Sequence, residues 1–237
     1  MTSTLTSEPL ASRGGAALMR KVELLRPRFV AASSAIWNVP GVDVAHVYRE
    51  YLVMLHQTIR TSVPMMQRAA ALAAARAEEG EPGAAELRDY LPEHAREERG
   101  HDKWVVEDIV TAGGDADEAQ RRIPSAEVAR FVGAHMYWIH YHHPAAVLGY
   151  IIPLETFPPT EPTLDFLRER TGLPESAFRT LVQHALLDPR HGVEAVEAVD
   201  RIVVTDEVAN VVGLSALHAL DGLGQAFTAL ARRLATN

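Results

Sequence analysis

The sequence has no cysteine among its 237 residues. Disulfides, zinc–thiolate sites and iron–sulfur clusters are therefore excluded, and any metal ion must be held by histidine and carboxylate side chains. Long hydrophobic runs are missing too, because no stretch approaches the roughly 18 apolar residues that a membrane span requires. The polar segment 1–15 lacks the apolar core of a signal peptide, and we interpret it as a flexible tail. The cytoplasm is the expected compartment.

Positive charge is in short supply. The chain has 23 Lys and Arg residues against 31 Asp and Glu residues, which gives a formal net charge of −8. This balance argues against nucleic acid or an anionic membrane as a partner. With 47% hydrophobic and 23% charged residues, the chain can bury a sizeable core, and we expect one domain over residues 16–237. A homodimer is a possible assembly.

Runs of β-branched residues are scarce, whereas alanine and leucine dominate the apolar set, which favours helix. Asp43 and Ser125 are suited to be N-caps, Pro64 should kink or split the helix that contains it, and Pro92 is a candidate break in the next. The expected helices cover residues 16–35, 43–77, 84–112, 125–143, 145–152, 163–170, 175–200 and 206–234. The sequence thus predicts an all-α bundle of seven or eight helices.

The strongest chemical signal is a set of three residues on one predicted helix, His184, Asp188 and His191. At about 100° per residue, their spacing of four and three places all three side chains within about 40° of one another. Leu181 and Leu187 lie close to this stripe, which should therefore face inward. Buried polar groups of this kind are unfavourable unless they bind something. The alternative is a capped or solvated helix with incidental histidines.

A second signal is the pair Glu98 and His101, with His94 four residues before Glu98. Glu-x-x-His is the pair that helical bundles use to bind iron or manganese from within their cores. The alternative is an ordinary solvated face, because Glu- and Arg-rich helices usually face water.

Glu155 is a third candidate, because it ends the strongly apolar segment 144–155. A carboxylate in such surroundings needs a cation or a strong hydrogen-bond partner, unless it merely caps the segment. Together the three signals supply three carboxylates and three imidazoles, a mixture that suits Fe(II) or Mn(II). Zinc is normally satisfied by three or four ligands, so six candidates point to two metal ions. The predicted ligands are Glu98, His101, Glu155, His184, Asp188 and His191.

Other histidines and aromatic residues are candidates for lining a cavity beside the metal ions, although most such residues are simply part of a core. Of the cluster at residues 140–143, we expect one histidine to face the cavity, because consecutive residues of a helix point in different directions. The predicted lining residues are His56, His94, Trp104, Tyr137, His140 and Tyr150.

Four segments together resemble a known family over about residues 45–220. The segments are Glu97-Glu98-Arg-Gly-His101-Asp-Lys-Trp104, Tyr137-Trp138-Ile139-His140, His143-Pro144 through Gly149-Tyr150 to Leu154-Glu155, and His184-x3-Asp188-x2-His191. In order and spacing they are similar to the iron-containing redox enzymes, which are heme-oxygenase-like diiron oxidases and oxygenases. The His-x3-Asp-x2-His element with a preceding glutamate is the most specific part of this resemblance.

The resemblance implies a heme-oxygenase-like helical fold without haem, and two iron ions held by the six residues named above. It also implies that the enzyme activates dioxygen to oxidise a small substrate by N-oxygenation, desaturation or cleavage. Many relatives act in natural-product biosynthesis, and an amino acid or its derivative is slightly favoured as substrate. An external electron donor is expected to reduce the irons after each turnover. The sequence leaves the identity of this donor open.

Two alternatives remain at this stage. A metal-free enzyme of the thiamin-salvage or quinone-cofactor type could use the same fold. A non-catalytic helical interaction protein could pair its inward polar groups with one another. A further expectation concerns Pro189, which lies between two predicted ligands and disfavours helical geometry at Asp188. We expect a distorted segment at residues 188–192 when no metal is bound.

Overall fold

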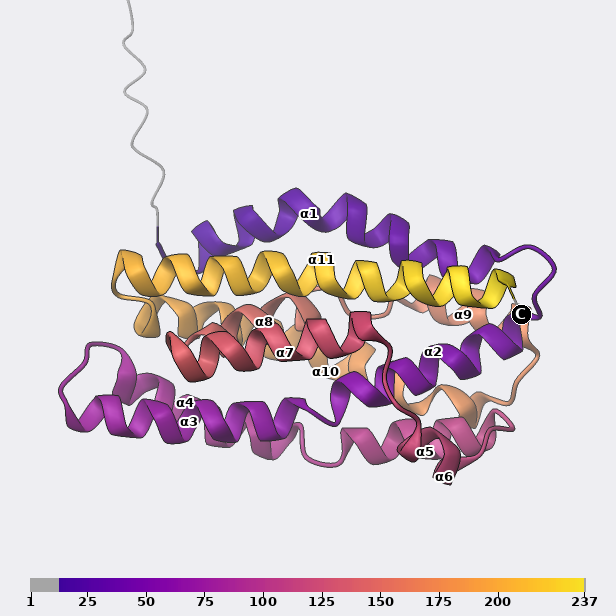
Figure 1. Cartoon of the computed structure of the whole chain (residues 1–237), viewed down its shortest axis with the longest axis horizontal. Helices are drawn as coiled ribbons and strands as arrows, with labels where there is room; N and C mark the ends of the chain where they lie inside the picture. Colours follow the sequence, from indigo (N-terminus) through magenta and orange to yellow (C-terminus); the bar gives the residue numbers. More distant parts are fainter. Residues whose placement is uncertain (1–12, 237) are drawn as a thin grey trace, which may run out of the picture.

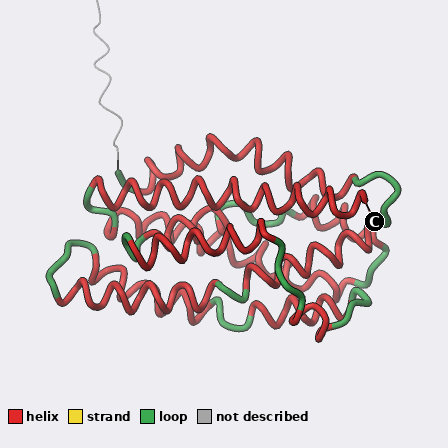
Figure 2. The backbone as a smooth tube through the Cα atoms, in the orientation of Figure 1, coloured by secondary structure: helices red, strands yellow, loops and turns green. Residues whose placement is uncertain are grey.

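The chain folds into a bundle of long helices, and no strand occurs among residues 13–236, the part that this computed structural model describes (Figures 1 and 2). This arrangement confirms the all-α prediction. The described residues form α1 (Gly15–Ala35), η1 (Ile36–Asn38), α2 (Val44–Ile59), α3 (Ser62–Glu78), α4 (Ala84–Glu97), α5 (His101–Thr111), α6 (Ala116–Arg121), α7 (Ala126–Tyr141), α8 (Ala146–Glu155), α9 (Glu161–Thr171), η2 (Glu175–Phe178), α10 (Arg179–Ile202) and α11 (Asp206–Thr236).

The long helices pack in pairs. Figure 1 shows α1 and α11 side by side along one face of the bundle, and α3 and α4 side by side along the opposite face. Helices α7, α8 and α10 lie between these pairs, and α2, α5 and α6 are grouped towards one end. The main hydrophobic core between the two faces is formed by residues of α1, α3, α4, α7, α8, α10 and α11, and residues of α2 and α5 belong to a second cluster.

The predicted tail meets the described residues only at its end. Residues 1–12 lie outside them, and Gly15 already begins α1, where its amide donates to Asp200 Oδ1 at 2.9 Å. In the part of the chain that is described, no helix combines the length and the apolar character needed to cross a lipid bilayer.

Local sequence explains where several helices begin. The Asp43 side chain accepts from the amide of Ala45 at 3.3 Å, and Ser125 Oγ accepts from the amide of Val128 at 3.3 Å. Both are the predicted N-caps, and each satisfies a donor that would otherwise lack a partner in the first turn.

The predicted helix at residues 43–77 is split close to Pro64, as the sequence analysis expected, whereas the candidate break at Pro92 does not occur. Helix α2 ends at Ile59, and Pro64 lies in the first turn of α3, where its missing amide hydrogen removes no helical bond. Pro92 lies inside an unbroken α4. The predicted helix at residues 84–112 is instead divided at Gly100, whose φ of +97° favours glycine.

The prediction of a distorted segment at residues 188–192 is also wrong, because α10 runs without interruption through Pro189. A proline inside a helix removes one hydrogen bond and adds a local clash. Asp188, His191 and Gly192, which lie next to Pro189 or within one turn of it, are all buried inside the bundle. Tertiary packing therefore holds the helix together where its local sequence disfavours it.

Helix α8 is the central element of the core, and every residue from Ala146 to Pro153 is buried. It lies so close to α11 that a Cβ added to Gly149 would come within 2.5 Å of both Ser215 Cβ and Val212 O. Only glycine allows this approach. As a result, the carboxylate at the end of α8, Glu155, is held inside the bundle at 7% exposure.

Candidate metal centre

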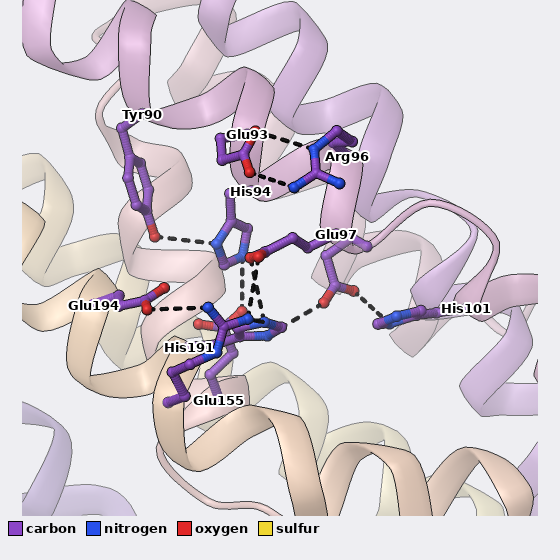
Figure 3. A network of polar contacts seen from close by, with 11 residues as sticks. Tyr90, Glu93, His94, Arg96, Glu97, His101, Glu155, His191 and Glu194 are labelled. Carbon is purple, nitrogen blue, oxygen red and sulfur yellow. Dashed lines mark hydrogen bonds and ion pairs between the residues drawn. The ribbon is translucent and has the colours of Figure 1, made fainter.

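Four helices bring acidic and imidazole side chains together in the interior. Glu98 follows α4 as its C-cap, and His101 begins α5 after the turn at Gly100. Glu155 ends α8, and the remaining predicted ligands lie along one face of α10. Figure 3 shows His94, Glu155 and His191 converging from different helices. The polar residues therefore come from elements far apart in the sequence.

The first group of potential ligands consists of Glu98, His101 and His184, whose ligand atoms all lie within 4.8 Å of one another. His101 Nδ1 is 3.1 Å from Glu98 Oε2, although a helix break separates the two residues. The rings of His101 and His184 meet edge to face at 5.0 Å. The turn at Gly100 thus preserves the proximity that the sequence analysis attributed to a continuous helix.

The second group consists of His94, Glu98 and Glu155, again with ligand atoms within 4.8 Å of one another. His94 Nε2 approaches Glu155 Oε1 to 2.7 Å, and His94 is only 3% exposed. The sequence analysis placed His94 in the cavity wall rather than among the ligands. Its position four residues before Glu98 was the available signal, because that spacing puts both residues on one face of α4.

Asp188 and His191 lie beside these two groups. His191 Nδ1 is 3.9 Å from Glu98 Oε1, and its ring meets that of His94 at 5.6 Å. Burial, together with the charges of Glu155 and Glu98, raises the pKa of Asp188 from 3.8 to about 8. Asp188 is therefore close enough to the other two carboxylates to feel their charge in a poorly solvated interior.

The carboxylates respond differently to this environment. Burial raises the pKa of Glu155, and the neighbouring His94 only partly opposes that effect. Burial acts in the same direction on Glu98, but the hydrogen bond with His101 and the electrostatic interactions with His101, His184 and His94 outweigh it, and the pKa of Glu98 is lowered. Glu98 is thus the carboxylate that most readily carries a negative charge at the centre of the cluster.

Two ligand atoms in the cluster, Glu155 Oε2 and His191 Nδ1, are buried without a hydrogen-bond partner among the described residues, and His94 Nε2 and His101 Nδ1 contact only carboxylate oxygens of the cluster itself. Leaving a buried polar group unpaired costs about 1–3 kcal/mol each. A cation bound between these atoms would satisfy them, and nitrogen and oxygen donors of this mixture suit iron. The residues present therefore fit the metal that the sequence predicted.

Outer contacts fix the orientation of three imidazole rings. His184 Nδ1 donates to Thr180 O at 2.8 Å, which leaves Nε2 free for a metal ion. Tyr90 Oη and His94 Nδ1 are hydrogen-bonded at 3.2 Å, as Figure 3 also shows. Histidine ligands in metalloproteins are typically held in this way through their second nitrogen.

The third ring is held by a residue that the sequence analysis did not single out. Glu97 Oε2 lies 3.3 Å from His191 Nε2, and Arg190 Nη2 donates to the same nitrogen at 3.0 Å, so this edge of the ring is held away from the cluster and Nδ1 faces it. Arg190 contacts the same carboxylate at 3.1 Å and balances its charge. Glu97 directly precedes a predicted ligand, but its role depends on a contact between α4 and α10 that no local pattern reveals.

A cavity of about 180 Å³ adjoins the cluster, and His94, Glu98, Glu155, His184 and Asp188 form its polar end. The rest of the wall is mostly apolar and is contributed by α1, α2, α3, α8, α10, α11 and the segment after α8. Among the other lining residues are Phe29, Met54, Leu55, Ile59, Met66, Tyr150, Ile151, Leu154, Phe157, Leu181, Leu223 and Phe227.

Only two of the six predicted lining residues, His94 and Tyr150, line this cavity. Tyr137 is 53% exposed, and His140, also exposed, contacts Arg68 on the surface. Trp104 stacks on His101 at 4.1 Å and is not part of the cavity wall, and His56 is buried on α2 outside that wall. Tyr137 and His140 of α7 thus face the solvent rather than the cavity.

Comparisons with known proteins agree with this geometry. A family model described as iron-containing redox enzyme matches residues 49–222. A domain of unknown function with a heme oxygenase-like fold from Shewanella denitrificans superposes with a TM-score of 0.79, at 19% identity over 92% of both chains. A TenA homolog from Pseudomonas syringae pv. tomato gives a TM-score of 0.67, at 12% identity over 96% of this chain and 98% of its own. At such identities the two structures establish the fold alone, and it is the predicted heme-oxygenase-like fold. A search of curated proteins found no match.

Proposed function

The chain belongs to the family of iron-containing redox enzymes, and from this premise we propose that it is a diiron oxidase or oxygenase. It would bind two Fe(II) ions and use dioxygen to oxidise a small molecule held in the adjoining cavity. The finer assignments of N-oxygenation, desaturation or cleavage, and of a role in natural-product biosynthesis, remain part of this proposal. So does the requirement for an external electron donor.

The observation that carries the proposal is that two groups of three potential ligands share one residue, Glu98. A carboxylate with two oxygens can bridge two metal ions, and the lowered pKa of Glu98 favours the charged form that such a bridge needs. One ion would be held by Glu98, His101 and His184. The other would be held by Glu98 and Glu155, with Asp188, His191 and His94 as its remaining potential ligands.

When bound, a pair of Fe(II) ions supplies the electrons and open coordination positions that dioxygen activation requires. The protein's own residues prepare the site for this chemistry. The apolar wall formed by residues such as Ile151, Leu154 and Leu181 excludes bulk water from the polar end of the cavity. Asp188, whose pKa is about 8, holds a proton on its carboxyl group at neutral pH and must release it to become a ligand.

Anaerobic titration of the metal-free protein with Fe(II) tests the proposal directly. We expect saturation at two ions per chain and a rise in Tm, because a ligand that binds only the folded state stabilises it. After oxygen is admitted, the iron-loaded protein should consume dioxygen in proportion to the iron bound, as measured with an oxygen electrode. Zn(II) is the control for metal binding without redox chemistry.

Two other functions predict different results. A metal-free enzyme on this fold would bind Fe(II) only weakly and would show no oxygen uptake that depends on iron. A non-catalytic helical protein would give the same negative result and would have no use for the cavity. Glu155 Oε2 and His191 Nδ1 favour the metalloenzyme, since in either alternative these two atoms would remain buried without hydrogen-bond partners.

A further inference from the structure

A groove on the outer surface lies next to the metal-lined cavity. It has a volume of about 450 Å³ and is formed by α1, α11 and the start of α7. Its lining is mixed, with apolar residues such as Leu25 and Leu220 beside the charged residues Arg28, Arg130 and Asp221. Arg28 and Asp221 pair at 3.1 Å. The groove therefore combines apolar and charged side chains in its lining.

Phe29 is the one residue, within the described part of the chain, that lines both this groove and the inner cavity. Its ring is partly exposed and lies 6.0 Å from the ring of Phe157 and 5.9 Å from that of Phe227. Phe157 and Phe227 both line the inner cavity. Three aromatic rings therefore form the partition between the outer groove and the space next to the metal ligands.

The Phe29 side chain lies at a point of α1 where the helix is less rigid. Helix α1 is the outer helix of its pair and is visibly bowed in Figure 1. Pro27, two residues before Phe29, removes one of the hydrogen bonds that would stiffen this part of the helix. Rotation of one half-buried ring at such a place requires little rearrangement of the core.

The inner cavity also restricts what could pass this partition. No lysine or arginine is present among the described residues that line it, and its charged groups are all at the metal end. Two of the other polar groups are already engaged, since Thr58 Oγ1 donates to Met54 O at 3.1 Å and Ser62 Oγ pairs with Tyr150 Oη at 2.8 Å, and the Tyr51 hydroxyl is uncharged. A charged head group in this part of the cavity would lose its hydration without gaining a partner of opposite charge.

We infer that Phe29 is the gate through which an uncharged, apolar substrate passes from the outer groove into the metal-lined cavity. The inference rests on the proposed function for the meaning of "substrate", and it replaces the slight preference for an amino acid that the sequence suggested. The charged residues of the protein line the outer groove, where water solvates them. A molecule that enters the inner cavity instead contacts three phenylalanine rings and a mostly apolar wall. Phe29 is thereby a specificity-determining residue, because the size of its side chain limits the opening.

The test for the gate uses the metal-free protein and the neutral fluorophore 1-aminonaphthalene, whose emission rises in an apolar cavity. Stopped-flow association rates are compared for Phe29→Ala and Phe29→Trp. The matched controls are Val30→Ala and Leu24→Trp, which change exposed residues of the same helix that line neither space. If Phe29→Ala does not fold, Phe29→Leu takes its place.

We expect the small side chain to speed association and the large one to slow it, with a ratio of at least fivefold between the two variants and unchanged rates in both controls. A smaller ratio, or an equal change in the controls, overturns the gate.

The test for the substrate class compares two ligands with the same chain length, 1-octanol and the zwitterionic 2-aminooctanoic acid, by isothermal titration calorimetry. We expect 1-octanol to bind at least fivefold more tightly, and any smaller preference overturns the assignment of an apolar substrate. Both tests use protein without metal, so they are independent of the Fe(II) titration. Gated binding of 1-octanol with no uptake of iron would refute the proposed function alone, and the reverse result would refute this inference alone.

Discussion

Replacing Asp188 with asparagine should stabilise the metal-free protein at neutral pH while removing an expected metal ligand. Asp188 is 4% exposed and lies near Glu155 and Glu98, and this environment raises its pKa from 3.8 to about 8. In the unfolded chain the carboxyl group ionises near its ordinary pKa. The folded protein therefore binds this proton more tightly than the unfolded chain does.

The sign of the pH dependence follows from that difference. The proton on Asp188 makes its full contribution to stability below about pH 4, and the contribution is lost as the pH rises towards 8, where the folded protein also releases the proton. At about 1.4 kcal/mol per pH unit, the loss between pH 3.8 and pH 7 is roughly 4 kcal/mol. Asparagine has a similar shape and no charge to bury, so the variant avoids this loss.

Urea unfolding of the metal-free protein at pH 4.5, 7 and 8.5 measures the effect. We expect Asp188→Asn to exceed the wild type in unfolding free energy by a small amount at pH 4.5, and by several kcal/mol at pH 7 and 8.5. Asp117→Asn, at a side chain that is 77% exposed, is the control and should show no such trend. A difference between Asp188→Asn and the wild type that does not change with pH would falsify the argument. In Fe(II) titrations the same variant should bind fewer than two ions.

Three further predictions concern ligation and packing. Glu98→Gln should reduce the bound iron from two ions per chain to less than one, measured by colorimetric iron analysis, because Glu98 belongs to both ligand groups. Glu97→Gln should weaken binding of one ion by about 10- to 100-fold and leave the other unchanged, since Glu97 orients only His191; equal weakening of both would contradict this role. Gly149→Ala should lower the unfolding free energy by about 1–3 kcal/mol or prevent folding. Gly133→Ala, on α7 with open space around it, should raise it by up to about 1 kcal/mol.

The sequence predicted the helical class because its signals are local. The N-caps Asp43 and Ser125 act within one turn, and the periodicity of apolar residues predicts which faces are buried. The spacing of His184, Asp188 and His191 was equally informative, since a continuous α10 places all three on one face. These features depend only on helix geometry, which a single sequence contains in full.

Where the local signals compete, the sequence was less reliable. Pro189 disfavours helix, and the chain alone gives no measure of the burial of Asp188, His191 and Gly192 that keeps α10 intact. The break between α4 and α5 was assigned to Pro92 rather than to Gly100. The positive φ at Gly100 is set by the relative orientation of α4 and α5, which the local sequence does not contain.

The sequence by itself thus determined that the chain is helical and which types of side chain are available to hold a metal ion. Only the tertiary structure decided that His94 lies among the potential ligands, that Tyr137 and His140 are exposed, and that Phe29 lines both the cavity and the outer groove. The physical reason is the range of the interactions. Helix formation depends on neighbours within four residues, whereas a metal centre and its cavity depend on the mutual packing of α1, α4, α8, α10 and α11, which is settled by contacts across the whole chain.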